Sequence, residues 1–343
     1  MRVLVIGGTG FVGVPLVRRL EEAGHELLVF HRGCMEREHG HAGDVEHVHG
    51  DRRDLASFAG RFGRFAPEVV LDVVPYSERD ARVVGETFRV MAGRVVALSS
   101  GDVYRAYGVL VGKEAGPPEP VPLGEDSPLR EELFPYRGVL EGMGDYEKIL
   151  VERVVVGDPD LPGTVLRLPM VYGPGDAQHR LFGYLRRMDD GRPAILVEEG
   201  FAVWRWTRGY VENVAAAIAL AVVDGRTAGR VYNVGEAEAL TEVEWVREVG
   251  RAAGWEGEVI AAPWDLFPAG TWPNFDTNQH LVYDTRRLRE ELGYEEPVSR
   301  EEALVGTVAW ERANPPEEVA TGMFDYATED AMLVELGRRF GGK

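Results

Sequence analysis

Three glycines at a spacing of three residues, Gly7, Gly10 and Gly13, place the strongest constraint on what this chain can fold into. They follow a short apolar run at 3–6 and open a segment at 11–23 whose apolar residues recur at helical spacing. Strand, glycine turn and helix in this order are the context that a dinucleotide-binding turn requires. The first glycine permits the tight bend, the second lets the backbone approach a pyrophosphate, and the third lets helix and strand pack closely. The alternative is a turn that binds nothing, but the flanks on both sides favour a cofactor.

This turn is the first candidate site. The backbone N–H groups at the start of a helix lack partners within the helix, so they can face an anion. The predicted cofactor contacts in this stretch are Gly7, Thr9, Gly10, Phe11, Val12 and Gly13.

Strands and helices alternate along the first half of the chain. The segment at 77–92 reads as a helix, and after the first strand at 3–6 five further short segments read as strands two to six: 25–30, 46–49, 68–74, 94–98 and 163–168. This alternation predicts an α/β fold with a Rossmann-type doubly wound parallel sheet and a smaller C-terminal α/β lobe.

The predicted domain division has three parts. Residues 1–175 form the dinucleotide-binding domain with an active-site helix at 144–156, 176–315 mainly form the substrate lobe, and 316–343 form a helical tail. Some segments of the lobe are expected to return to the first domain. The tail could supply the interface of a homodimer.

Composition narrows the functional classes. The net charge of −19 argues against partners such as nucleic acid or an anionic membrane surface. No apolar run approaches the roughly 18 residues of a membrane span, and no signal peptide precedes the first strand. A single cysteine, Cys34, fits a reducing cytoplasm. No zinc spacing is present, so no metal is expected; four neighbouring histidines read as loop and strand-edge residues: His39, His41, His47 and His49.

The G-x-x-G-x-x-G spacing resembles the short-chain dehydrogenase/reductase superfamily, and the length suggests its extended or atypical branch, the NAD-dependent epimerase/dehydratase-like family. The resemblance implies an NAD(P)-dependent enzyme that moves hydride to or from a carbon of a sugar or nucleotide-sugar type substrate. Two alternatives stay open: a redox-sensing or scaffold protein that binds NADP without catalysis, and an RNA-binding protein similar to the chloroplast stem-loop-binding proteins. The net charge disfavours the RNA-binding alternative.

The end of the second predicted strand bears on cofactor choice. An acid near this point would select NAD, whereas an arginine accommodates the 2′-phosphate of NADP. Arg32 stands here and no acid does, which favours NADP over NAD. The resemblance implies that Asp51 contacts the adenine, although a helix N-cap is an equally good and compatible role. It also implies cofactor contacts at Arg52, Val74 and Pro169.

Chemistry is expected at the carboxyl end of the fifth predicted strand, where ligands gather in open α/β sheets. Residues 99–104 resemble the family's S-S-x-x-V-Y motif. Ser100 would then hydrogen-bond a substrate oxygen. Asp102 takes the place of an acid/base carboxylate of the dehydratases, whose neighbouring acid is replaced by Gly101. The alternative is a simple turn with a solvated Asp102.

The active-site helix departs from the family's Y-x-x-x-K motif. Lys148 fits the lysine, which would hold the nicotinamide ribose, but Gly144 stands where the tyrosine belongs. Tyr146 is two residues before Lys148, roughly 200° around an ideal helix. The helix could start late, so that Tyr146 reaches the site anyway, or the site could bind cofactor without catalysis. A third alternative is another proton carrier, among Asp102, Asp145, Tyr104 and Tyr136.

Substrate contacts are expected from the second half of the chain. Residues 105–143, rich in glycine and proline, should cover the substrate cleft. Met170 stands where an asparagine commonly helps to hold a nucleotide-sugar, which weakens the case for that substrate. A strand predicted at 202–207 leads to a motif that brings an arginine toward the substrate, with the register ambiguous between Arg205 and Arg208.

Overall fold

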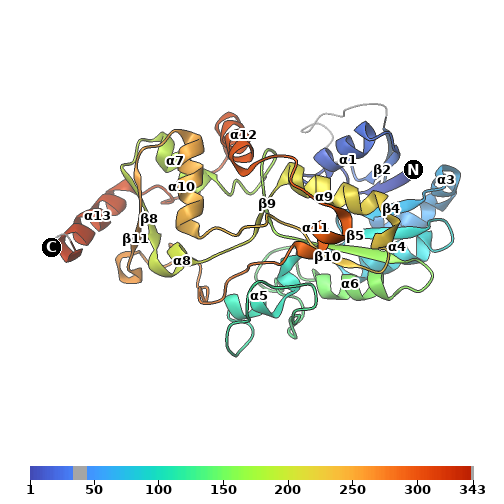
Figure 1. Cartoon of the computed structure of the whole chain (residues 1–343), viewed down its shortest axis with the longest axis horizontal. Coiled ribbons are helices and arrows are strands. Elements are labelled where there is room, and N and C mark those ends of the chain that lie inside the picture. Colours follow the sequence, from blue (N-terminus) through green and yellow to red (C-terminus); the bar gives the residue numbers. More distant parts are fainter. Residues whose placement is uncertain (34–44, 341–343) are drawn as a thin grey trace.

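The structure, a computed structural model, describes residues 1–33 and 45–340, so Cys34, His39 and His41 lie outside the described residues. A seven-stranded parallel sheet forms one end of the molecule (Figure 1). Its strand order is β10-β6-β5-β4-β1-β2-β3. The strands are β1 (Arg2–Ile6), β2 (Glu26–His31), β3 (Glu46–His49), β4 (Val69–Asp72), β5 (Arg94–Ser100), β6 (Gly163–Leu168) and β10 (Val231–Asn233). The order reverses between β1 and β4, and ligands bind at such a switch point.

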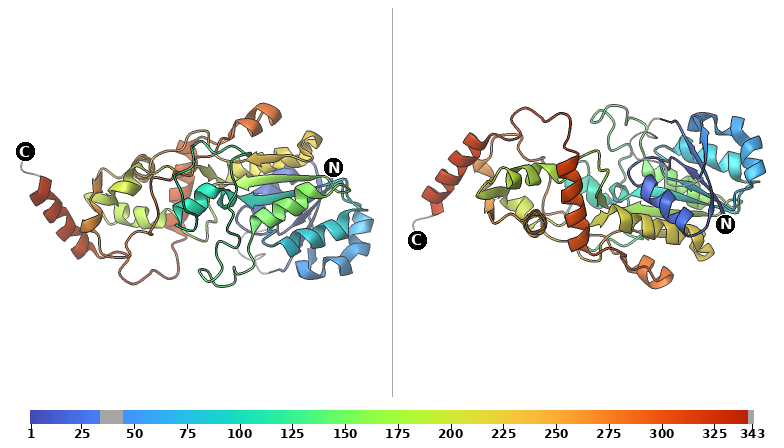
Figure 2. Two further views of the ribbon diagram at one scale, coloured as in Figure 1. Left: turned by 90° about the horizontal axis from the view of Figure 1, so that it is seen from below. Right: turned by 90° about the horizontal axis from the view of Figure 1, so that it is seen from above.

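Helices cover both faces of the sheet (Figure 2). On one face α1 (Gly13–Glu22) packs against α9 (Val211–Val223), and on the other α4 (Glu78–Phe88) packs against α6 (Lys148–Gly157). Successive residues of β1 therefore enter two separate hydrophobic cores. Burial on both faces explains the nearly continuous apolar strands. The helical segments beside this sheet also include η1 (Arg52–Phe58), α3 (Ala59–Phe65), η2 (Gly101–Val103), α5 (Arg105–Leu110), η3 (Gly225–Thr227) and α11 (Arg286–Leu292).

A second lobe occupies the other end of the molecule (Figure 1). Its strands form the parallel pair of β8 (Ala194–Glu198) and β11 (Glu258–Ala262). A further parallel pair, β7 (Met170–Tyr172) with β9 (Arg208–Tyr210), is separate from both sheets. The lobe's helical segments are α7 (Phe182–Asp189), α8 (Glu199–Val203), α10 (Glu242–Ala253), η4 (Trp264–Leu266) and α12 (Arg300–Ala313), followed by α13 (Tyr326–Phe340) at the C-terminal end.

The predicted α/β class and parallel sheet are confirmed, and the strands at 46–49 and 163–168 have the predicted bounds. The strand predicted at 202–207 is wrong, because Ala202 lies within α8 and the strand of this region is β9, which begins only at Arg208. The alternation of Trp204 and Trp206 suggested a strand, but it has another cause. Trp204 is buried in an aromatic cluster and donates its indole N–H to the Gln279 carbonyl at 2.8 Å. Within the described part of the chain, no helix has the length and apolar character to cross a membrane.

Candidate active site

The glycine turn after β1 has the predicted geometry. Gly7 adopts φ +85°, and a Cβ there would lie 2.5 Å from a methyl group of Val74. A Cβ on Gly13 would lie 2.6 Å from the Gly8 carbonyl carbon, so α1 packs directly on the turn. A Cβ on Gly10, by contrast, would meet no described atom within 4 Å. The turn therefore fits a dinucleotide on the Gly10 side, and the predicted contacts of the half-buried Thr9, Phe11 and Val12 remain a prediction.

The ends of β2 and β3 carry the groups expected near the adenine ribose. Arg32 is exposed directly after β2. Asp51 is the N-cap of η1, because its carboxylate accepts the Arg53 N–H at 2.9 Å. Hydrogen bonds from Arg53, and further the charge of Arg32, lower the pKa of Asp51. The N-cap role of Asp51 is confirmed, while its adenine contact stays a prediction.

Arg52 is held by the end of β4. Its guanidinium donates to both carboxylate oxygens of Asp72, at 2.7 and 3.1 Å, and to the Val74 carbonyl at 2.6 Å. Asp80 lies 3.0 Å away on a third side. With these partners, the geometry favours a role in positioning Val74 over the predicted direct cofactor contact of Arg52.

The active-site helix begins later than predicted. α6 starts at Lys148 rather than at residue 144, because Glu147 adopts an extended backbone (φ −158°, ψ 98°) and caps the helix. Its carboxylate accepts the Ile149 N–H at 2.9 Å. Tyr146 therefore precedes the helix, and the angular argument that placed it on the wrong face does not apply. The late-start alternative is the one that the structure confirms.

Tyr146 reaches the predicted reaction centre. Its hydroxyl donates to Asp102 Oδ2 at 2.8 Å, and Lys148 Nζ lies 5.6 Å from its ring centroid. Burial, then the charge of Asp102, raise the pKa of Tyr146, and a hydrogen bond with Ser100 offsets part of the rise. The alternative of a solvated Asp102 is wrong: this residue is 6% exposed, and burial raises its pKa against the hydrogen bond from Tyr146.

Lys148 is buried between two strand ends. Its ammonium donates to the carbonyls of Pro75, at 2.8 Å, and Leu98, at 2.9 Å. An ammonium has three donors, so one N–H is left for a ligand. Burial lowers the pKa of Lys148 to about 8, although the nearby charge of Asp102 opposes the shift.

Of the four other candidate proton carriers, Asp102 and Tyr136 lie at the centre with Tyr146, whereas Asp145 and Tyr104 do not. Asp145 has a side chain that is 96% exposed and lies beside Arg137, away from Asp102. Tyr104 is fully buried and donates to Asn233 Oδ1 at 2.6 Å, which is a structural role. Tyr136, from the 105–143 segment, donates to Asp102 Oδ2 at 3.0 Å. The structure thus gathers Asp102, Tyr146 and Tyr136. That the whole segment 105–143 covers the substrate cleft stays a prediction.

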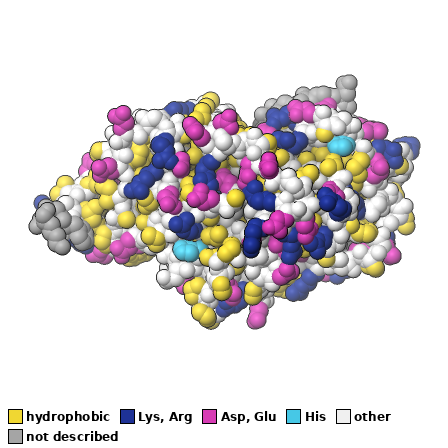
Figure 3. Space-filling view, in the orientation of Figure 1, with side chains coloured by type: hydrophobic (Ala, Val, Ile, Leu, Met, Phe, Trp, Pro, Cys, Tyr) yellow, Lys and Arg dark blue, Asp and Glu magenta, His cyan; other side chains and the backbone are white. Residues whose placement is uncertain are grey.

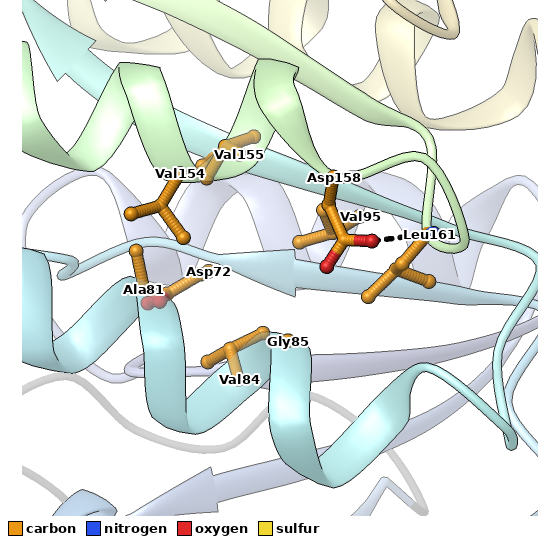
Figure 4. Close-up of a pocket in the computed structure, with 10 residues that line it drawn as sticks. Asp72, Ala81, Val84, Gly85, Val95, Val154, Val155, Asp158 and Leu161 are labelled. Atoms are coloured by element: carbon orange, nitrogen blue, oxygen red, sulfur yellow. Dashed lines mark hydrogen bonds between the residues drawn. The ribbon is translucent and has the colours of Figure 1, made fainter.

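A groove of about 410 Å³ borders Tyr146. The volume lies within the range of small-molecule sites, roughly 300–1,000 Å³. Gly144, at the place of the missing tyrosine, lies on its wall, together with Tyr76, Ser77 and Met143. Figure 4 shows a much smaller cavity between α4 and α6, about 10 Å³ and lined largely by apolar side chains. That cavity holds at most one water molecule and is a packing gap.

Tyr283 explains why residue 101 is a glycine, and no motif in the sequence pointed to this tyrosine. A Cβ on Gly101 would overlap the Tyr283 hydroxyl, so this buried phenol fills the space that any side chain at residue 101 would need. The two residues are 182 positions apart, and only the fold brings them together.

Gly101→Ala should therefore destabilise the protein by about 1–3 kcal/mol through overpacking. Urea denaturation measures the change in the free energy of unfolding. Gly144→Ala is the matched control, because its Cβ meets no described atom within 4 Å. Equal stability of the two variants would show that Tyr283 does not fill this space.

The predicted substrate residues lie where the lobes meet. Met170 pairs with Arg208 across β7 and β9, and both are buried. Arg208 donates to the Glu242 carboxylate and stacks over Trp245, with its guanidinium carbon 4.4 Å from the ring centroid. The structure places this arginine in an ion pair. Arg205 is partly exposed and donates to the Ala239 carbonyl at 2.7 Å. Pro169 directly precedes β7.

Comparisons with known proteins identify the family of the chain. The sequence model described as NAD dependent epimerase/dehydratase family matches residues 3–235. The chain belongs to that family. Family membership and the glycine turn make it an NAD(P)-dependent enzyme with a nicotinamide dinucleotide as cofactor, which confirms the predicted class.

Individual relatives are distant. The 2′-dehydrokanamycin reductase of Streptomyces kanamyceticus is 28% identical over 275 residues, 77% of this chain and 70% of that protein. The dTDP-6-deoxy-L-talose 4-dehydrogenase (NAD(P)(+)) of Kitasatospora kifunensis is 29% identical over 315 residues, 85% and 90% of the two chains. The UDP-glucose 4-epimerase of Thermotoga maritima, solved with UDP-glucose, shares the fold with a TM-score of 0.68 at 22% identity, covering 91% of this chain and 99% of that chain.

Proposed function

We propose that this enzyme uses NADP(H) to interconvert a ketone and a secondary alcohol on a sugar-like substrate. The observation that carries the proposal is the phenol of Tyr146, hydrogen-bonded to Asp102 beside the buried Lys148. The nicotinamide would supply or accept the hydride. Ser100 would polarise the substrate oxygen, Tyr146 would move the proton, and Lys148 would hold the ribose.

The protonation state of Tyr146 favours reduction. Because burial and the Asp102 charge raise its pKa, the phenol holds its proton at neutral pH. A protonated phenol next to a carbonyl oxygen is a general acid, and general acid catalysis by a positioned side chain is worth about 10²–10⁴ in rate. Asp102 would orient the phenol before the reaction. The Tyr146 O–H would then turn from Asp102 to the substrate oxygen and pass its proton as hydride reaches the carbon, and the phenolate left behind would regain a proton from solvent.

The substrate class rests on the relatives and on the second lobe. The relatives include a 2′-dehydrokanamycin reductase and a dTDP-6-deoxy-L-talose 4-dehydrogenase, and these names support a sugar-like substrate. For a nucleotide-sugar, Arg208 would have to exchange its buried partner Glu242 for a phosphate. A sugar without a diphosphate would leave that ion pair intact, so both kinds of ketone belong in the assay.

Denaturing freshly purified protein and identifying the released nucleotide by mass spectrometry tests the cofactor. Assays of NADPH oxidation with ketones of sugars and nucleotide-sugars then test the reaction. An empty protein that binds NADPH and reduces a ketone supports a reductase, which must exchange its cofactor. Near-stoichiometric tightly held dinucleotide would instead favour the internal redox cycle of an epimerase or dehydratase.

Arg32 carries the choice of NADP. Arg32→Gln should raise the Kd of NADPH about 10- to 100-fold, because a hydrogen bond to a charged group is worth about 1.5–3 kcal/mol. The Kd of NADH should stay the same. Fluorescence titration with both cofactors measures the two constants, and Arg53→Gln, beside Asp51, is the control. Equal losses for both cofactors would refute NADP selection by Arg32.

The remaining alternatives lose their main support. The scaffold alternative rested on Gly144, and Tyr146 offers a phenol despite that glycine. Figure 3 shows basic and acidic side chains interspersed on one face, whereas RNA binding uses a basic patch. The cytoplasmic location and the homodimer remain predictions.

A further inference from the structure

The carboxylate between Tyr146 and Lys148 is the least accessible charged group of the site. Glu147 is fully buried, with a relative exposure of 0%. It faces Arg130, whose Nη2 lies 3.1 Å from its Oε1, and the side chain of Arg130 is 2% exposed. Neither residue has a counterpart in the motifs that predicted the site. Burial of two charges is costly unless both are well paired, so this pair needs an explanation.

Glu147 controls where α6 begins. Its carboxylate accepts the Ile149 N–H, which is the bond of an N-cap, and its extended backbone ends the helix on that side. Tyr146 is thereby released from the helix and can point toward Asp102. An uncapped helix that continued to residue 144 would carry Tyr146 to the other face.

Arg130 joins the same carboxylate to the strand end that carries Asp102. Its Nε donates to the Asp102 carbonyl, Nη1 to the Glu132 carbonyl, and its backbone N–H to the Val103 carbonyl at 2.8 Å. Glu147 also accepts the Phe134 N–H. The chain from 130 to 134 is therefore fixed on the site, and two residues later the Tyr136 hydroxyl meets Asp102 Oδ2 at 3.0 Å.

We infer that Arg130 and Glu147 are positioning residues that replace the missing Y-x-x-x-K geometry: their ion pair sets Tyr146 and Tyr136 together on Asp102. This inference rests on the proposed function for its catalytic meaning. Tyr136 becomes a second phenol of the centre, donating to the same carboxylate oxygen as Tyr146, with the two ring centroids 5.1 Å apart. Because both phenols donate to Oδ2, Asp102 Oδ1 is left as the atom that a substrate hydroxyl can meet; it has no hydrogen-bond partner among the described residues.

The arrangement can be tested without a substrate. Incorporated 3-fluorotyrosine gives a ¹⁹F NMR resonance for each of the 12 tyrosines, and Tyr136→Phe and Tyr146→Phe assign the two that matter. Arg130→Lys keeps the charge but cannot reach the three acceptors at once. Glu147→Gln keeps the cap oxygen and removes the charge. Both variants should shift the resonances of Tyr136 and Tyr146 together.

Kinetics then test the catalytic meaning, with the ketone that wild-type protein reduces and NADPH. Each variant should lower kcat about 10- to 100-fold and change the Kd of NADPH less than about threefold, and the double variant should lose no more than the worse single one, because the pair acts as a unit. Glu119→Gln is the matched control: it breaks the Arg105–Glu119 pair on the same segment outside the site. Its kcat and both resonances should stay as in wild type.

The outcomes separate the two proposals. Unmoved resonances in Arg130→Lys and Glu147→Gln, or full kcat, overturn the positioning role while leaving the reductase in place. A kcat loss that only follows thermal instability, or that appears equally in Glu119→Gln, overturns it as well. If wild-type protein reduces no ketone, the proposed function fails, yet the paired resonance shifts would still support the assembly of the two phenols by this ion pair.

Discussion

Tyr146→Phe should lower the rate of ketone reduction about 10²–10⁴-fold, the size of a lost general acid. The Kd of NADPH should change little, since Tyr146 bonds to Asp102 rather than to the residues of the glycine turn. Steady-state kinetics with NADPH, together with fluorescence titration of the cofactor, measure the two effects. Retention of wild-type kcat would exclude Tyr146 as the proton carrier and direct attention to Tyr136.

A second-site variant sharpens this test. Gly144→Tyr in the Tyr146→Phe background restores the sequence motif Y-x-x-x-K, and a Cβ at residue 144 meets no described atom within 4 Å. Residue 144 lies before the start of α6, however, so a tyrosine there would not share a helix face with Lys148. We expect no rescue. Recovery of activity would mean that α6 extends to residue 144 in the working enzyme and that the late helix start is wrong.

Lys148→Met should lower cofactor affinity about 10- to 100-fold and reduce activity in parallel, because it removes a charged hydrogen-bond donor. The pH dependence gives the sharper signature. The pKa of Lys148 is lowered to about 8, so the ammonium is charged below pH 8 and loses its proton above it. The Kd of NADPH should therefore change little from pH 7 to 7.5, where the 2′-phosphate is already ionised, and rise above pH 8 in wild type. Lys148→Met should bind NADPH weakly and show no further rise in Kd above pH 8.

Lys113→Met is the control for this experiment, since Lys113 donates to the Pro135 carbonyl in the covering segment. Its cofactor affinity and pH profile should match wild type. A wild-type Kd that stays constant through pH 9, or a Lys148→Met variant that binds NADPH normally, would remove Lys148 from the ribose site.

Local patterns in the sequence determined the fold of the first domain. The run at 3–6, the three glycines and the helical spacing after them predicted β1, the turn and α1, because each of these signals lies within about 20 residues of chain. The strand at 163–168 was equally predictable, since it is buried on both faces and a strand of that kind reads as a short apolar run. Lys148, Ser100 and Asp102 followed from motifs of the same local kind.

The arrangement of the active site was decided by tertiary contacts. The start of α6 depends on Glu147, whose partner Arg130 lies 17 residues earlier. Tyr136 and Tyr104 were equally good candidates for the proton carrier in the sequence. In the fold, Tyr136 donates to Asp102, whereas Tyr104 donates to Asn233. Residue 101 must be a glycine because the Tyr283 side chain occupies the space of its Cβ, and only the fold brings the two residues together. Periodicity and spacing report on neighbours along the chain, whereas a buried hydroxyl or charge is defined by partners that only folding brings within about 3 Å.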